Sequence, residues 1–263
     1  MSAKVEFTVF TKPWKDVPLP ELARMVKALG FDGVELPVRP GFQVTPDSVA
    51  KGLPAAGRIL ADCGLKIGTV AGPTDEPTIA ACAEVGVPII RICVPIPEET
   101  DYLTAVADRQ RQWDALVPLL DKYGVAIGIQ NHCGRCITHA MHLRHAIGKY
   151  DPKHLCAVWD AAHNALQGEN ADLALDVVWS HLRVVNLKNA YWRRAPARDA
   201  QPAEWEIHWT GGREGIANWP GVARELMKRN YEGDVCLTAE YSDKQQVDRL
   251  IAEDIEFTKS LFA

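Results

Sequence analysis

The sequence has little that would direct the protein to a membrane or to nucleic acid. No apolar run reaches the roughly 20 residues that a membrane-spanning helix needs. Lysine and arginine together number 29 against 34 aspartates and glutamates, so the formal net charge is −5. No basic arm or face stands out, which argues against nucleic acid as a partner. The first ten residues run directly into a strand-like segment, so we expect no targeting segment.

Cysteine is present in an odd number, and we expect no secretory signal. Seven cysteines in this setting indicate free thiols in a reducing compartment, and we expect a cytoplasmic protein. A single C-x-x-C pair, Cys133 and Cys136, directly follows His132. Three further histidines come after it at a spacing of three: His139, His142 and His145. Because no second pair and no thioredoxin-like context accompany it, a plain loop and a solvated helix are favoured over a zinc or redox role.

A dinucleotide-type glycine fingerprint is also missing after the first expected strand, which argues against an open doubly wound sheet. What recurs instead is a helical segment, a glycine and a short apolar strand. The pattern predicts strands at residues 5–10, 33–36, 65–70, 89–94, 125–130, 155–159, 182–187 and 234–239. It predicts helices at residues 19–29, 46–63, 77–85, 100–123, 138–150, 171–179, 219–230 and 243–261. Eight of each predict an α/β fold, a (β/α)8 TIM barrel, as a single domain over residues 1–263.

The connection at about residues 188–218 is long and has no clear periodicity. It is rich in tryptophan and arginine, which is not a disordered composition. These residues are Trp192, Trp205, Trp209, Arg193, Arg194 and Arg198. Loops of this length are usually functional, so we expect a lid over the catalytic face. If its arginines reach the mouth of the barrel, an anionic ligand group is implied. An interface in a homo-oligomer is the alternative, and one loop can serve both purposes.

Large polar residues gather at the carboxyl ends of the expected strands, where TIM barrels build their active sites. They are Glu35, Arg91, Gln130, His132, Asp160, His163, Asn186, Lys188 and Glu240. The two-residue period of a strand places Gln130 and His132 on one face, and likewise Asn186 and Lys188. His163 is expected in a loop just beyond the sixth strand. We therefore predict one pocket at the mouth of the barrel.

Six stretches together carry a family resemblance. They are FDGVEL at 31–36, IQNH at 129–132, WDAAH at 159–163, VNLKN at 185–189, GREGI at 212–216 ahead of Trp219-Pro220, and TAE at 238–240. Their order and spacing resemble the xylose isomerase-like TIM barrels, the sugar (phosphate) isomerase/epimerase superfamily that also includes endonuclease IV-type enzymes. A nuclease of that last type is disfavoured by the acidic balance and by the lack of its many extra histidine and carboxylate ligands.

The resemblance implies a divalent metal site with two substituted ligands. In that family the metal is usually held by a Glu, an Asp, a His and a Glu at the ends of strands five to eight, and the two glutamates move the proton. The matching positions here are Gln130, Asp160, Asn186 and Glu240. Such an oxygen-only set suits Mg²⁺, Mn²⁺ or Ca²⁺ better than Zn²⁺ and should bind weakly. Otherwise a basic side chain such as Lys188 must compensate the two carboxylates.

These residues predict an enzyme of isomerase or epimerase type that acts on a small polyhydroxylated carbonyl compound. A lyase or dehydratase on the same barrel and a vestigial, metal-free binding protein are the alternatives. Glu240 and His163 are expected as acid/base groups, with His132 as another candidate base and Lys188 or Arg91 polarising an oxygen. The residues expected to bind substrate are Glu35, Arg91, His132, Trp192 and Arg193.

Overall fold

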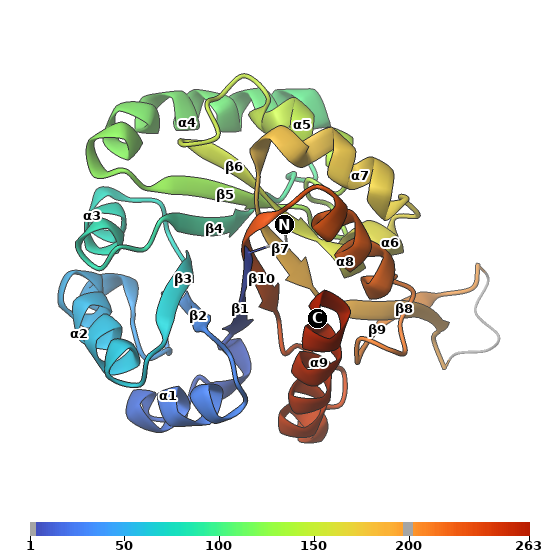
Figure 1. The fold of residues 1–263 in the computed structure, drawn as a ribbon. Coiled ribbons are helices and arrows are strands. Elements are labelled where there is room, and N and C mark those ends of the chain that lie inside the picture. Colours follow the sequence, from blue (N-terminus) through green and yellow to red (C-terminus); the bar gives the residue numbers. More distant parts are fainter. Residues whose placement is uncertain (1–3, 197–201) are drawn as a thin grey trace.

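The protein folds into a closed barrel of eight parallel strands surrounded by helices (Figure 1). The computed structural model describes residues 4–196 and 202–263. The barrel strands are β1 (Lys4–Phe10), β2 (Gly33–Pro37), β3 (Lys66–Ala71), β4 (Ile89–Cys93), β5 (Ala126–Gln130), β6 (Leu155–Asp160), β7 (Leu182–Leu187) and β10 (Glu232–Leu237). They close in the order β1-β10-β7-β6-β5-β4-β3-β2. The predicted TIM barrel and its eight strands are confirmed.

Helices follow the strands around the outside of the barrel. They are α1 (Leu19–Ala28), α2 (Val49–Asp62), α3 (Glu76–Glu84), α4 (Tyr102–Tyr123), α5 (Ala140–Ile147), α6 (Ala161–Leu166), α7 (Ala171–Val178), α8 (Trp219–Lys228) and α9 (Val247–Phe262). Short 3₁₀ turns occur at η1 (Lys12–Trp14), η2 (Pro46–Ser48), η3 (Trp179–His181) and η4 (Lys244–Gln246). In the described part of the chain, no helix combines the length and the apolar character needed to cross a membrane.

Glycine explains why the sequence pattern located these elements. Gly30, Gly64, Gly86 and Gly124 follow α1 to α4 and have φ between +66° and +86°. This left-handed conformation ends a helix and carries no side-chain penalty for glycine. Each glycine therefore turns the chain from an outer helix toward the next strand.

One prediction about local structure is wrong: His163 lies in helix α6 instead of a loop. The Asp160 side chain accepts a hydrogen bond from the backbone N–H of His163 at 3.1 Å and so caps the first turn of α6. Aspartate is among the best N-cap residues, and the two alanines that follow favour the helix. The helix fixes the direction in which His163 leaves the backbone.

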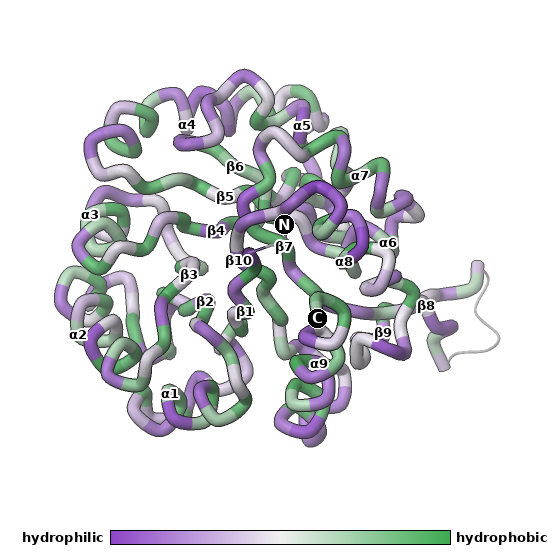
Figure 2. The backbone as a smooth tube through the Cα atoms, viewed as in Figure 1, coloured by the Kyte–Doolittle hydropathy of each residue, from purple (hydrophilic) through white to green (hydrophobic). Residues whose placement is uncertain are grey.

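The interior of the barrel is filled by small and branched side chains. Gly128 shows how little room remains, because a Cβ there would lie 2.7 Å from Val158 Cγ2 and 2.8 Å from Ile89 Cγ2. A second and larger core lies between the strands and the helices. Figure 2 shows hydrophobic residues along the strands and alternation along the outer helices. The strand ends are thus held rigidly.

The long connection forms an antiparallel hairpin of β8 (Asn189–Arg194) and β9 (Trp205–Thr210). In Figure 1 it extends to the side of the barrel beyond α6 and α8. Trp192 Nε1 donates to the carbonyl of Leu166 in α6 at 3.1 Å, and Arg193 Nε lies 2.6 Å from Glu206 Oε1 across the hairpin. Arg198 lies outside the described residues. An interface role for this segment stays a prediction.

Candidate active site

A cavity of about 390 Å³ opens at the carboxyl ends of the barrel strands. Its lining is Phe10, Lys12, Arg39, Arg91, Cys93, Gln130, His132, His163, Asn186, Lys188, Trp209, Thr238, Glu240 and Lys244. Of the residues predicted for the site, Glu35 and Asp160 lie directly beneath this lining. Trp192 and Arg193 do not line the cavity, because the hairpin turns them toward α6 and toward Glu206.

A larger hollow of about 720 Å³ lies at the opposite, amino-terminal end of the barrel. Lys66 in its wall already pairs with Glu6 and, at 2.6 Å, with Asp234. Among the described residues, every buried polar side-chain atom in the lining of this hollow has a hydrogen-bond partner. Because that end of a TIM barrel usually serves stability, the cavity at the carboxyl ends is the candidate active site.

Lys188 and Glu240 form the charged centre of the cavity. Lys188 Nζ lies 2.9 Å from Glu240 Oε2, and Lys12 Nζ contacts the other oxygen of the same carboxylate. Burial raises the pKa of Glu240, but the two lysines outweigh it and lower this pKa to about 2. Ala239, directly before Glu240, has φ +51°, a strained conformation for alanine that aims the carboxylate at the lysines.

The hairpin contributes one wall of the cavity through Trp209. The Lys188 ammonium lies 3.7 Å from the centroid of the Trp209 ring, a cation–π contact, and the His163 ring meets the same tryptophan at 5.2 Å. Lys188 is only 7% exposed. Its charge is therefore held between a carboxylate and an aromatic face, with little water around it.

Glu35 and Arg91 form a buried ion pair in the floor of the site. The Arg91 guanidinium contacts both Glu35 oxygens, with Nε 3.3 Å from Oε2, and Thr69 Oγ1 donates to Oε2 at 3.1 Å. Burial lowers the pKa of Arg91, but the Glu35 charge outweighs it and raises this pKa overall. Arg91 thus lines the cavity, and Glu35 lies beneath it with its carboxylate bound by Arg91 and Thr69.

Replacing Arg91 with methionine is expected to destabilise the fold by about 3–5 kcal/mol, because it leaves the buried Glu35 carboxylate without a counter-charge. The double variant Arg91→Met/Glu35→Gln should recover most of this loss, since no uncompensated charge remains. Urea unfolding followed by circular dichroism measures both. Equal destabilisation by the single and double variants would contradict the ion-pair explanation.

Asp160 is fully buried behind the cavity wall and has no free oxygen toward it. Its Oδ2 accepts a hydrogen bond from Gln130 Nε2 at 2.9 Å, and its Oδ1 accepts the His163 N–H. Asn131 fixes the same residue through two hydrogen bonds to its backbone. Burial raises the pKa of Asp160, and the charge of Lys188 lowers it by a smaller amount.

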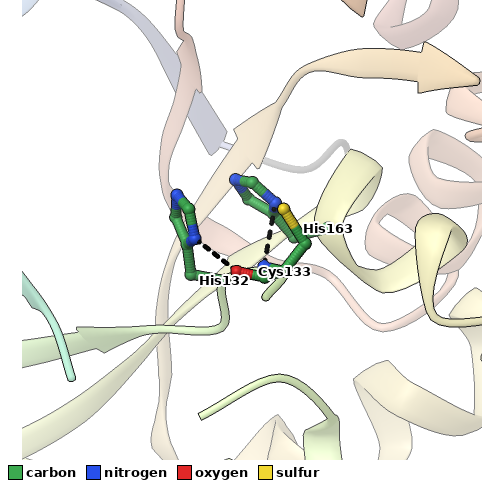
Figure 3. Close-up of side chains that lie close together, drawn as sticks. All are labelled: His132, Cys133 and His163. Atoms are coloured by element: carbon green, nitrogen blue, oxygen red, sulfur yellow. Dashed lines mark hydrogen bonds between the residues drawn. The ribbon is translucent and has the colours of Figure 1, made fainter. Parts of the chain in front are cut away.

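Two histidines stand side by side with opposite tautomers, both set by Cys133 (Figure 3). His132 Nδ1 lies 2.9 Å from the Cys133 carbonyl oxygen, which can only accept, so Nδ1 carries the proton and Nε2 of neutral His132 keeps a lone pair. The Cys133 N–H donates to His163 Nδ1 at 3.1 Å, so His163 carries its proton on Nε2. Burial lowers the pKa of His163 well below its usual value, and the ring is neutral.

Two buried polar atoms of the cavity lining have no hydrogen-bond partner within the described residues. They are Nε2 of His163 and Oδ1 of Asn186, one a donor and the other an acceptor. Leaving such groups unpaired costs free energy of about 1–3 kcal/mol each. A bound molecule with hydroxyl and carbonyl oxygens would satisfy both, so the cavity has the character of a binding site.

Residues 23–261 match the family model described as xylose isomerase-like TIM barrel. The chain belongs to this family. No curated protein matches the sequence.

Among solved structures, similar folds occur in sugar epimerases and in a dehydratase. The 3-keto-D-glucoside 4-epimerase of E. coli superposes with a TM-score of 0.73 at 15% identity, covering 98% of this chain and 100% of that one. D-psicose 3-epimerase of Clostridium cellulolyticum H10 gives 0.73 at 13%, covering 98% and 99%. The probable 3-DHS dehydratase AsbF of Bacillus anthracis gives 0.69 at 12%, covering 97% and 98%. At these identities the likeness shows the fold alone.

The metal ligands expected for a xylose isomerase-like barrel do not fit a divalent ion in this chain. Gln130 presents its NH₂ group to Asp160, Asp160 is fully buried with a hydrogen bond to each oxygen, and both Glu240 oxygens contact lysines. Among the described residues, Asn186 Oδ1 is the one side-chain oxygen of these four residues that has no partner. Instead of a metal ion, the positive charge of Lys188 compensates the negative charge of Glu240. The sequence had left this alternative open.

His132, Cys133 and His163 place three potential ligand atoms within 4.8 Å of one another. The hydrogen-bond network nevertheless leaves few lone pairs. His163 uses Nδ1 as an acceptor and carries a proton on Nε2, and burial raises the pKa of the Cys133 thiol to about 11. Metals bind the thiolate and the unprotonated imidazole nitrogen. This cluster therefore does not fit a metal ion either.

Seven residues of the lining were not among the predicted site residues, although Trp209 was expected in the lid: Phe10, Lys12, Arg39, Cys93, Trp209, Thr238 and Lys244. For two of them a signal was present. Continuing the two-residue period of β1 from Phe10 reaches Lys12, and continuing β2 from Glu35 through Pro37 reaches Arg39. Trp209 and Lys244 come from the hairpin and from the turn η4, whose positions depend on tertiary packing.

Proposed function

We propose that this protein is an isomerase- or lyase-type enzyme that removes a proton beside the carbonyl group of a small polyhydroxylated substrate, without a divalent metal. The observation that carries the proposal is the pairing of an imidazole lone pair on His132 with two buried donors, His163 Nε2–H and the Lys188 ammonium. All three groups line one cavity. Base and oxyanion donors in one water-poor site are what enolisation requires.

In this proposal His132 Nε2 takes the proton from carbon and later returns it, to the neighbouring carbon in an isomerisation or to the departing hydroxyl group, which leaves as water, in an elimination. As the proton leaves carbon, negative charge develops on the carbonyl oxygen, and the Lys188 ammonium and His163 Nε2–H stabilise it. Fixed donors in a water-poor cavity act strongly on such charge, because they need no reorganisation. Asn186 Oδ1 accepts a hydrogen bond from a substrate hydroxyl and so orients the chain of carbons.

Glu240 was expected as an acid/base group, and we assign it a positioning role instead. A carboxylate with a pKa of about 2 and two ammonium partners is a weak base at neutral pH. It holds the Lys188 side chain in place against Trp209. The proton-accepting role passes to His132, which the sequence analysis also considered.

A dehydratase is the second candidate, and Gln130 favours it over an epimerase. Epimerisation at one carbon removes a proton from one face and returns it to the other, which needs a base on each side. Gln130 stands where the family usually has a glutamate, and an amide cannot accept that proton. Isomerisation and elimination can both proceed with the base on one face.

Deuterium exchange tests this function without knowledge of the product. A panel of ketoses, aldoses and keto acids in D₂O, with protein freed of metal by a chelator, is followed by proton NMR. We expect loss of the signal from the carbon beside the carbonyl for at least one compound. His132→Gln should slow this exchange by about 100-fold or more, whereas Cys136→Ser should leave it unchanged. Exchange that requires added metal, or none across the panel, would refute the proposal.

A further inference from the structure

The mouth of the cavity is positively charged although the whole chain is acidic. Five cationic side chains line it: Lys12, Arg39, Arg91, Lys188 and Lys244. Among the lining residues Glu240 is the one carboxylate, and Glu35 lies just beneath. The formal net charge of the chain is −5, so this concentration of cations is local. Such a mouth attracts anions and raises their local concentration.

Arg39 and Lys244 are the lining cations without an ion pair in the described residues, and of the two Arg39 is half-buried whereas Lys244 lies exposed in η4. The Arg39 guanidinium makes no hydrogen bond or ion pair with any side chain in residues 4–196 or 202–263, whereas Arg91 is held by Glu35 and Lys188 by Glu240. Arg39 and Arg91 both stand over the Phe10 ring, with their Cζ atoms 5.6 and 4.7 Å from its centroid. Two guanidinium groups thus share one small region with a single carboxylate partner, and an anion there would be favourable.

The backbone around Arg39 is fixed, so the guanidinium does not depend on a mobile loop. The Arg39 N–H donates to the Val44 carbonyl at 3.1 Å, and Val38 and Val44 form a bridge. Gln43 Nε2 ties the same turn to the carbonyls of Trp14 and Val17 at 2.8 and 2.9 Å. Asp75, which shares a neighbouring hollow with Arg39, is occupied as the N-cap of α3. A preorganised cation of this kind suits ligand recognition.

We infer that the substrate carries an anionic group, a carboxylate or a phosphate, that is bound by Arg39 at the β2–β4 side of the cavity. This inference rests on the proposed function for the opposite side of the cavity, where His132 follows β5, His163 lies in α6 and Lys188 follows β7. The anionic end and the reacting carbonyl then lie at opposite ends of one short chain of carbons. A cavity of about 390 Å³ holds a single molecule of this size.

The proposed anion site lies beside Arg39 and not at the hairpin, whose arginines were expected to bind an anion if they reached the mouth of the barrel. Arg193 is occupied by Glu206 and does not line the cavity. Arginine is well suited to the role of Arg39, because its planar fork matches the two oxygens of a carboxylate or a phosphate. With an anionic group added to the proposed carbonyl substrate, the expected substrates are acidic sugars, sugar phosphates or hydroxylated keto acids.

Three polyols that lack an aldehyde or ketone group test the inference by calorimetric titration: D-glucitol, D-gluconate and D-glucitol 6-phosphate. Since binding alone is measured and none carries the aldehyde or ketone on which the proposed proton transfer acts, the result does not depend on that step. We expect at least one anionic polyol to bind about tenfold or more tightly than D-glucitol, with the difference shrinking in high salt. Whichever anion binds more tightly identifies carboxylate or phosphate as the natural group.

Variants then locate the site. Arg39→Gln should weaken binding of the preferred anion by about tenfold or more while leaving D-glucitol unchanged, and Arg39→Lys should recover part of the loss. Arg58→Gln, an exposed arginine at the other end of the barrel, is the matched control for lost charge. Equal binding of all three polyols by the wild type, a loss in Arg193→Gln instead of Arg39→Gln, or equal losses for anionic and neutral polyols would overturn the inference.

Discussion

Replacing Lys188 with methionine is expected to lower the rate of deuterium exchange by about 100- to 1000-fold, the usual effect of removing one oxyanion donor. The methionine keeps most of the side-chain volume but removes the charge that faces Glu240 and Trp209. Single-substrate kinetics should show the loss mainly in kcat, because the charge acts on the developing oxyanion. Lys149→Met, which removes an exposed lysine paired with Asp114, is the control for loss of one positive charge.

The same variant also changes how stability depends on pH. In the wild type the pKa of Glu240 is lowered to about 2. The carboxylate therefore stabilises the fold above the ordinary glutamate pKa, and this contribution is lost as the pH falls toward 2. Without Lys188 the pKa of Glu240 rises, so Glu240 contributes less to the decline of the unfolding free energy between about pH 5 and pH 2. Urea unfolding at several pH values measures the slope, and an unchanged slope would contradict the pairing.

Converting the site back to a metal site should require three substitutions. We expect the wild type to bind Mn²⁺ no more tightly than about the millimolar range and to keep its exchange activity in a chelator. Gln130→Glu and Asn186→His add a charge and a nitrogen donor, but Lys188 still occupies Glu240. Adding Lys188→Met frees Glu240 Oε2, while Lys12 still contacts Oε1, so the triple variant should bind Mn²⁺ about 100-fold more tightly, or some 2.7 kcal/mol.

Calorimetric titration with Mn²⁺ compares the wild type, the double variant and the triple variant. A second triple variant, with Lys244→Met in place of Lys188→Met, controls for the loss of a positive charge at the mouth. If the double variant already binds as tightly as the triple, Lys188 does not compete with the metal. Micromolar binding by the wild type would show that its own residues rearrange into a metal site.

The barrel was predictable because its signals are local. Apolar runs of strand length, glycines after helices and polar residues at strand ends each depend on neighbours in the chain. The same logic placed Gln130, Asn186, Lys188 and Glu240 around one mouth. It failed for the hairpin, because the pairing of β8 with β9 spans a connection in which aromatic and charged residues mask the alternation.

The partners of the polar residues were not predictable. Nothing in the sequence shows that Gln130 turns its amide to Asp160, or that Lys12 and Lys188 share Glu240. Nor does it distinguish the tautomers of His132 and His163, which depend on a peptide group between strand and loop. A sequence match identifies which residues meet, whereas the hydrogen-bond geometry decides whether they hold a metal or a proton.

The control of both histidines by Cys133 runs through its main chain. Its carbonyl accepts a hydrogen bond from His132 Nδ1, and its N–H donates one to His163 Nδ1, so the main chain fixes both tautomers. The thiol takes no part in these two hydrogen bonds. Scanning mutagenesis changes only side chains and would therefore not reveal this role of the main chain. Another small residue at this position would keep both hydrogen bonds as long as the loop keeps its path. Conservation scores for such a position would then record the size of the side chain and miss the residue that organises the chemistry.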